Sequence, residues 1–160
     1  MNRKWKDIAI IGLFPVLLLF CALPTLPVVA SAGEEETVRV IREFFEKFSR
    51  RDQEGMIDQL LELFTPDALY VIPTGTYQGK EKIRERLATL VETRRDSRYT
   101  MTKILVQGSD AATEYVSEFT DRKTGKYVRY SGVGLWQIEG GKIRSVKWYL
   151  DTNTIQKQLQ

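Results

Sequence analysis

The sequence predicts an α+β fold in which a curved antiparallel sheet wraps around about three helices. After residue 32, apolar residues first recur every three or four positions, which indicates helices. From Tyr99 to Asp151 they recur at alternate positions, which indicates consecutive strands. The pair Gly140-Gly141 joins two of these strands in a tight hairpin. This order places the helices on one side of an antiparallel sheet, with no parallel crossover.

The first 32 residues differ in composition from the rest of the chain. A basic start precedes the apolar run 8–29, and Ala30-Ser31-Ala32 supplies the small residues that a signal peptidase reads. We therefore expect residues 1–32 to be a cleaved signal peptide and the protein to be secreted or periplasmic. The alternative is an uncleaved membrane anchor through residues 8–29, although three prolines interrupt this run. Residues 33–160 then form one domain.

The composition of this domain excludes several kinds of chemistry. Removing the three bases and one acid of the leader leaves 21 basic and 20 acidic residues, interleaved along the chain, so no nucleic-acid partner is expected. The chain has no histidine, and its one cysteine, Cys21, lies in the leader. Zinc sites built from His and Cys, thiol nucleophiles and disulfides are therefore excluded. We expect no metal and no cofactor, and any acid–base chemistry must use carboxylates, tyrosines or lysines.

Three amphipathic helices are predicted, over residues 33–52, 54–64 and 80–93. Acidic residues begin the first helix and basic residues end it, as the helix dipole favours. Pro66 stops the second helix, because the residue before a proline avoids the helical conformation. Four arginines in or just after the third helix are interpreted as its solvated face: Arg84, Arg86, Arg94 and Arg95.

The strands are predicted from alternating patterns bounded by turn residues. They are a short strand over residues 69–72 with a second short strand after Pro73, followed by strands over residues 99–106, 111–120, 127–139 and 142–151. The tail, residues 152–160, either forms a short helix or frays.

A two-residue turn at Gly140-Gly141 sets the predicted register of the last hairpin. Glu139 then faces Lys142, and Tyr130 faces Asp151. One face carries apolar residues that need cover: Val133, Leu135, Val146, Trp148 and Leu150. The other face is mixed and carries Tyr130, Trp136, Ile138, Ile143 and Tyr149. Gly132 and Gly134 lie on the mixed face, where they allow a bend or a close approach.

Four segments together resemble the SnoaL-like branch of the nuclear transport factor 2 (NTF2) superfamily. They are Phe64-Thr-Pro-Asp-Ala-Leu-Tyr70, Tyr77-Gln-Gly-Lys-Glu-Lys-Ile-Arg84, Gly140-Gly-Lys-Ile143 and Trp148-Tyr-Leu-Asp-Thr152. The resemblance covers about residues 38–152. It implies a cone-shaped roll with a pocket at its wide end, and a homodimer formed through the outer sheet face. Members of the superfamily include polyketide cyclases, ketosteroid isomerase relatives, epoxide hydrolases, dehydratases and proteins without catalytic activity, so the fold does not choose the function.

Asp151 is the first candidate for a catalytic residue, because the resemblance places a proton-transferring aspartate late in the chain. Burial in an apolar cavity would raise its pKa, and the phenol of Tyr130, placed opposite, could polarise a substrate carbonyl. The alternative is that Asp151 caps the following segment by accepting from the amides of Asn153 or Thr154. The histidine that some related dehydratases and cyclases use is missing, and the Asp-Arg-Asp set of related epoxide hydrolases cannot be placed.

Four aromatic residues are candidates for binding a ligand, because aromatic walls with a polar edge suit a small, partly apolar molecule. They are Tyr70, Tyr115, Trp136 and Tyr149. Their alternative role is simple core packing. Glu114 and Glu118 form either a buried pair or, in the interpretation we favour, a solvated stripe.

Two functional hypotheses follow. In the first, the domain is an exported module that binds a small apolar or amphipathic molecule in its cone. In the second, it is a cofactor-independent acid/base enzyme of isomerase or cyclase type that uses Asp151 with a tyrosine. The direction of Asp151 discriminates between them, because only an enzyme needs this carboxylate inside the pocket.

Overall fold

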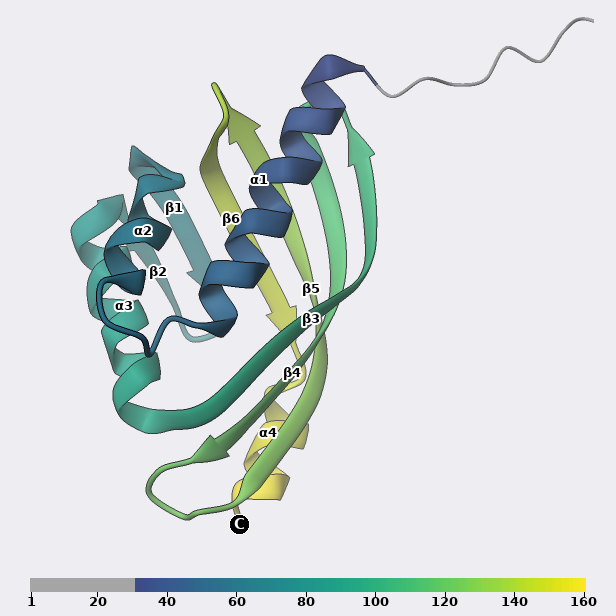
Figure 1. The fold of residues 1–160 in the computed structure, drawn as a ribbon. Helices are drawn as coiled ribbons and strands as arrows, with labels where there is room; N and C mark the ends of the chain where they lie inside the picture. The colour runs from purple at the N-terminus through teal and green to yellow at the C-terminus, as the bar shows by residue number, and fades with distance from the viewer. Residues whose placement is uncertain (1–30) are drawn as a thin grey trace, which may run out of the picture.

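The computed structural model describes residues 31–160 and forms a bent sheet that curves around helices (Figure 1). The helices are α1 (Ala32–Ser49), α2 (Met56–Glu62), α3 (Gly79–Thr93) and α4 (Thr152–Leu159). The strands are β1 (Phe64–Ile72), β2 (Gly75–Gln78), β3 (Arg94–Gln107), β4 (Asp110–Asp121), β5 (Tyr127–Glu139) and β6 (Lys142–Leu150). The predicted α+β fold with a curved sheet around helices is confirmed. The tail is helical, and β1 and β3 begin earlier than predicted, at Phe64 and Arg94.

The predicted signal peptide, or its alternative as an anchor, lies outside the described residues except for its last two positions. Ser31 is the N-cap of α1, where it accepts from the amide of Glu34, and the Glu34 carboxylate accepts from the amide of Ser31 in return. This reciprocal pair satisfies two of the free amides at the helix start. Within residues 31–160, no helix combines the length and the apolar character that crossing a bilayer requires.

The six strands form one sheet in the order β2-β1-β6-β5-β4-β3. All neighbours are antiparallel except β1 and β6, which run parallel, so the expectation of no parallel crossover is wrong. The tight turn after Ile72 pairs β2 with one edge of β1. The other edge of β1 is therefore free to pair with β6. The amide of Ile143 donates to the carbonyl of Leu63 at 2.7 Å where the two strands first meet.

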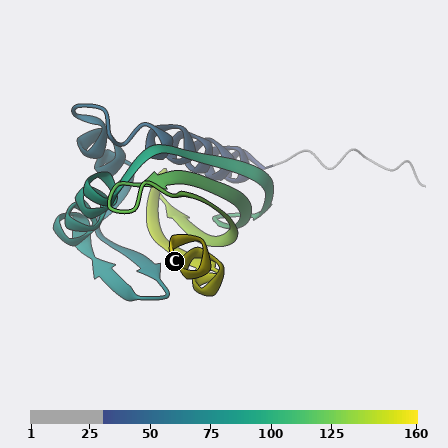
Figure 2. The same ribbon diagram turned by 90° about the horizontal axis from the view of Figure 1, so that it is seen from below.

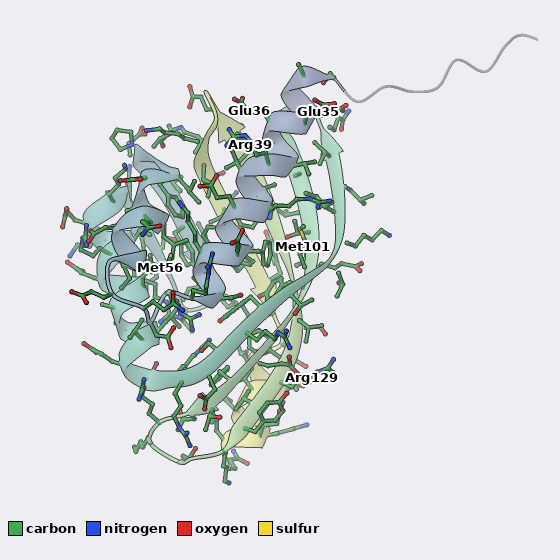
Figure 3. The ribbon with its side chains drawn as sticks, viewed as in Figure 1. Glu35, Glu36, Arg39, Met56, Met101 and Arg129 are labelled. Carbon is green, nitrogen blue, oxygen red and sulfur yellow. The ribbon has the colours of Figure 1, made fainter. Side chains whose placement is uncertain are left out.

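Helix α1 lies in the concave side of the sheet and contributes Phe44, Phe45 and Phe48 to the aromatic core. The Phe44 ring lies 5.1 Å from Trp136 and 6.0 Å from Trp148, and the Phe48 ring lies 4.6 Å from Tyr99. The opposite side of α1 carries exposed charged residues, among them Glu36 and Arg39 (Figure 3). The amphipathic pattern of this helix therefore fixes which side meets the sheet.

The last hairpin departs from its predicted register by one residue. Glu139 pairs with Lys142 and Ile138 with Ile143, as predicted, but a bulge at Arg144 then pairs Trp136 with Val146. The extra residue switches the alternation of β6, so that Ile143, Val146 and Trp148 all face the core.

The predicted assignment of the two hairpin faces is therefore wrong for β5. Trp136 and Ile138 are buried, whereas Val133 and Leu135 lie on the outer face with 37% and 41% of their surface exposed.

Two glycines make room for the rings of the concave face, as the sequence predicted. A Cβ at Gly132 would lie 2.6 Å from the Cζ atom of Tyr115, and one at Gly134 would lie 2.9 Å from Nε1 of Trp136. Tyr115 cannot retreat easily, because it is 2% exposed and its ring packs edge-on against Trp148 at 5.0 Å. The missing side chains thus leave room for the aromatic rings to approach the backbone of β5 closely.

Gly132→Ala should lower the free energy of unfolding by about 1–3 kcal/mol, because the new methyl group overlaps the Tyr115 ring. Gly75→Ala is the matched control, since a Cβ there meets nothing closer than 3.8 Å. Urea unfolding measures both. Equal stability of the two variants would contradict the close approach at Gly132.

Candidate functional site

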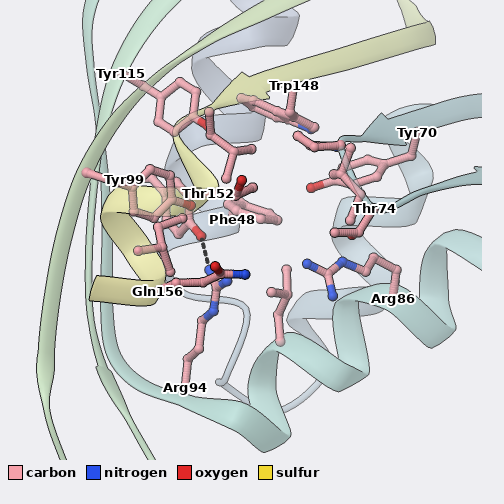
Figure 4. A pocket seen from close by; sticks show the side chains of 16 residues that line it. Phe48, Tyr70, Thr74, Arg86, Arg94, Tyr99, Tyr115, Trp148, Thr152 and Gln156 are labelled. Atoms are coloured by element: carbon pink, nitrogen blue, oxygen red, sulfur yellow. Dashed lines mark hydrogen bonds between the residues drawn. The ribbon is translucent and has the colours of Figure 1, made fainter. Parts of the chain in front are cut away.

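A cavity of about 230 Å³ lies between the concave sheet face, α3 and α4 (Figure 4). Its lining comes from α1, α3, α4, the turn after β1 and all strands except β2: Phe48, Tyr70, Ile72, Pro73, Thr74, Arg86, Leu90, Arg94, Tyr99, Tyr115, Tyr130, Trp148, Leu150, Thr152, Ile155 and Gln156. The cavity begins where the aromatic core under α1 ends. The predicted pocket at one end of the roll is therefore present.

Helix α4 lies across one end of the curved sheet, as the view from below shows (Figure 2), and its residues form one side of the cavity. Ile155 and Gln156 contribute to the lining, yet no residue of α4 is fully buried. Gln158 ties the helix to β5, since its side chain accepts from the Arg129 amide and donates to the Arg129 carbonyl, both at 2.9 Å. The cover is thus held by a few polar bonds and partial apolar contacts.

The cavity wall is rich in phenols. Burial raises the pKa of the hydroxyl groups of Tyr70, Tyr115 and Tyr130 above the ordinary value for tyrosine. These groups therefore stay protonated at neutral pH, where each can donate one hydrogen bond and accept others. Such a wall combines apolar ring faces with polar edges.

Two arginines reach this cavity, and their interpretation as solvated residues is wrong. Arg86 lies on α3 and Arg94 caps its C-terminal end, so together with Leu90 they follow a spacing of four residues. This spacing puts them on the side of the helix that faces the cavity, where Figure 4 shows both guanidinium groups. Arg84 and Arg95 do face solvent and pair with acidic residues there.

Arg94 is held in place by its neighbours. Its Nη1 donates to the Tyr99 hydroxyl at 3.0 Å, and its Cζ lies 4.1 Å from the centre of the Phe119 ring. Behind Tyr99, the buried Arg51 donates to the carbonyl of Phe48 at 2.8 Å, and its Cζ lies 5.2 Å from the Tyr99 ring. Tyr99 thus sits between two positive charges.

These charges change the acidity of Tyr99. Burial by itself would raise the pKa of its phenol, but the guanidinium groups of Arg94 and Arg51 outweigh burial, so the pKa lies below the ordinary 10.0. No carboxylate belongs to the 16 lining residues, so nothing acidic in the lining offsets the arginines. Among residues 31–160, no cluster of three or more His, Cys, Asp or Glu residues could hold a metal ion.

The structure places Asp151 outside this cavity, as the N-cap of α4. Its carboxylate accepts from the Thr154 amide at 3.1 Å and from the Thr154 hydroxyl at 2.6 Å. These hydrogen bonds lower the pKa of the carboxyl, whereas the acid/base hypothesis requires a raised one.

Asp151 and Tyr130 are not brought together. The bulge in β6 and the start of α4 leave Asp151 beyond the ladder, while Tyr130 pairs with Ser117 and lines the cavity. This arrangement matches the capping alternative.

The four predicted ligand-binding aromatics divide into three groups. Tyr70 and Tyr115 line the cavity. Trp136 lies behind the wall, donating from Nε1 to the Thr113 hydroxyl at 2.9 Å and packing 5.1 Å from the Trp148 ring. Tyr149 lies on the outer face with 56% of its surface exposed.

Sequence reasoning missed Arg86, Arg94 and Tyr99. The spacing of the two arginines around Leu90 is the signal that could have found them. Glu114 and Glu118 lie on the outer face of β4, as the favoured interpretation predicted.

Tyr99 should ionise at a lower pH than an ordinary tyrosine, because the cations beside it favour the phenolate. An ultraviolet titration of the native protein and of Tyr99→Phe measures this, since the difference between the two curves isolates one phenol. The difference step should fall below pH 10.0. Tyr70→Phe serves as the control, and its difference step should fall above that pH, because burial raises the pKa of Tyr70. The reverse order would contradict the assignment.

Solved structures with the same fold have diverse names. A candidate SnoaL-like polyketide cyclase from Jannaschia sp. CCS1 gives a TM-score of 0.75 and 16% identity, covering 82% of this chain and 96% of that one. A Catenulispora acidiphila DSM 44928 protein with a ketosteroid isomerase-like fold was solved with trimethylamine. It gives a TM-score of 0.67 and 19% identity, covering 74% of this chain and 90% of that one. An LEH-like epoxide hydrolase from M. tuberculosis gives a TM-score of 0.67 and 16% identity, covering 79% of this chain and 90% of that one. At these identities the likeness establishes the fold alone.

Sequence comparison identifies the family. No curated protein matches the chain. The model of the SnoaL-like domain, however, matches residues 41–146, which is more than half of the 160 residues. This match agrees with the four segments that resemble the family and with the observed cone. The chain therefore belongs to the SnoaL-like domain family, and its fold is that of NTF2-like proteins.

Proposed function

We propose that this protein is an exported module that binds a small, partly apolar molecule in the cavity beneath α4. The cavity of about 230 Å³ carries the proposal. It is larger than a cavity of about 150 Å³ that accepts benzene, and it presents aromatic faces with hydroxyl edges, as small-molecule sites do. Export follows from the signal peptide predicted at residues 1–32.

The acid/base alternative has less support. Proton transfer by Asp151 needs its carboxylate beside the substrate, but this carboxylate is exposed and occupied with the start of α4. Similar folds carry names from several chemistries, and one was solved with trimethylamine. These names therefore do not favour one reaction, and binding is the proposed activity.

Filling the cavity should weaken binding. Ile155→Trp places a large ring in the lining from α4, so the affinity for the small neutral compound indole should fall by about tenfold or more, since indole loses its apolar contacts. Asn153→Trp adds the same ring at an exposed position of the same helix and should leave the affinity unchanged. Calorimetric titration measures both.

Equal indole affinity in the two tryptophan variants would place the binding site elsewhere and overturn the proposal. Asp151→Asn addresses the alternative, because asparagine also caps helices. This variant should keep the fold and the indole affinity of the native protein.

The homodimer is also part of the proposal. The outer sheet face exposes Leu105, Leu135 and Tyr149, with 59%, 41% and 56% of their surfaces accessible. Apolar residues grouped on one face are typical of interaction sites. This face therefore supports pairing of two copies through their sheets.

Leu135→Lys should convert a dimer to a monomer, because it would bury an unpaired charge at that interface. Gln53→Lys adds the same charge at an exposed loop position and should leave the dimer intact. Sedimentation velocity distinguishes the species. A native protein that stays monomeric at high concentration would contradict the dimer.

A further inference from the structure

The polar groups of the cavity indicate which class of molecule fits it. We propose that the cavity binds a small organic acid, with its carboxylate between Arg86 and Arg94 and its apolar body against Trp148 and Tyr115. This inference rests on the proposed binding function and adds the charge of the ligand. It concerns recognition only and involves no chemical step.

The first argument is the charge balance. Arg86 and Arg94 have no carboxylate within 4.0 Å among the residues described, whereas Arg84 on the same helix contacts Asp58 at 2.6 Å. The described part of the lining adds two positive charges and no negative one. A partly buried cation without a partner is unfavourable, and an anion in the cavity would remove this cost.

The second argument is the set of unused hydrogen-bond donors. The Nε1 of Trp148 and the Nε of Arg86 are both buried without a partner in the described structure. Trp148 is only 5% exposed and lines the cavity. Both atoms can donate but cannot accept. A ligand that satisfies them must present acceptors, as a carboxylate does.

The third argument is that the arginines are already positioned. Both guanidinium groups lie over aromatic rings, with Cζ of Arg94 4.1 Å from the centre of Phe119 and Cζ of Arg86 5.9 Å from the centre of Tyr77. Arginines supported in this way keep their N–H edges available for planar acids such as carboxylates. Figure 4 shows both groups turned toward the middle of the cavity, below Trp148 and Tyr70.

The size of the cavity limits the acid. A volume of about 230 Å³ exceeds that of the benzene-sized cavity of about 150 Å³ by room for a few further atoms. One aromatic ring with a short acidic side chain fits this description. Cinnamate is a suitable probe, and cinnamamide is its neutral counterpart with nearly the same shape.

Calorimetric titration of the full protein with both probes tests the proposal. Cinnamate should bind at least about tenfold more tightly than cinnamamide, because only the carboxylate accepts from two guanidinium groups at once. Inorganic phosphate should bind more weakly than cinnamate, since it lacks the apolar body. Phosphate binding as tight as that of cinnamate would overturn the apolar part of the proposal.

Variants assign the effect to the two arginines. Arg86→Gln and Arg94→Gln should each weaken cinnamate binding by about tenfold and leave cinnamamide binding nearly unchanged. Arg84→Gln is the matched control, because Arg84 lies on the same helix and faces Asp58, and it should change neither. Should either glutamine variant fail to fold, Arg86→Lys and Arg94→Lys keep the charge but lose the planar fork, and they should still weaken cinnamate binding.

The outcomes separate this inference from the proposed function. Equal affinity for cinnamate and cinnamamide, or a preference that survives both arginine substitutions, would overturn the organic acid while leaving a binding cavity. Binding of indole without binding of cinnamate would do the same. Absence of binding by cinnamate, cinnamamide and indole would instead refute the proposed function.

Discussion

The structure depends on one packing arrangement, in which Phe44 of α1 meets Trp136 and Trp148 of the sheet. These rings can share one side only because the bulge in β6 changes its alternation and because Gly134 leaves room beside them. The contact fixes the distance between helix and sheet near the middle of the molecule. Trp148 also lines the cavity, so the same packing arrangement forms part of its wall.

The sequence predicted most of the fold, because helical and alternating patterns reflect which side of each element is buried. It could not predict the bulge, since a single residue beyond the turn at Gly140-Gly141 leaves the pattern of β5 unchanged. It also could not reveal that β1 pairs with β6 in parallel, because strand order depends on contacts between distant segments. Both errors arise from pairing and not from the identification of elements.

The site was predicted less well than the fold. Tyr70, Tyr115 and Tyr130 were named and do line the cavity, because all three lie on the buried face of their strands. The arginines were assigned to solvent because most arginines on helices lie there. Asp151 was predicted to be catalytic because it belongs to the family signature. Its role depends on which groups surround its carboxylate, and the structure shows the Thr154 amide beside it.

The way in which α4 is attached affects exchange between the cavity and solvent. This helix buries none of its residues completely and is tied to β5 through Gln158, so detaching it exposes far less apolar surface than separating α1 from the sheet. Local opening of such a segment costs only a fraction of the free energy of global unfolding. A guest molecule could therefore enter and leave while the aromatic core stays folded, and its residence time would be governed by one short C-terminal segment.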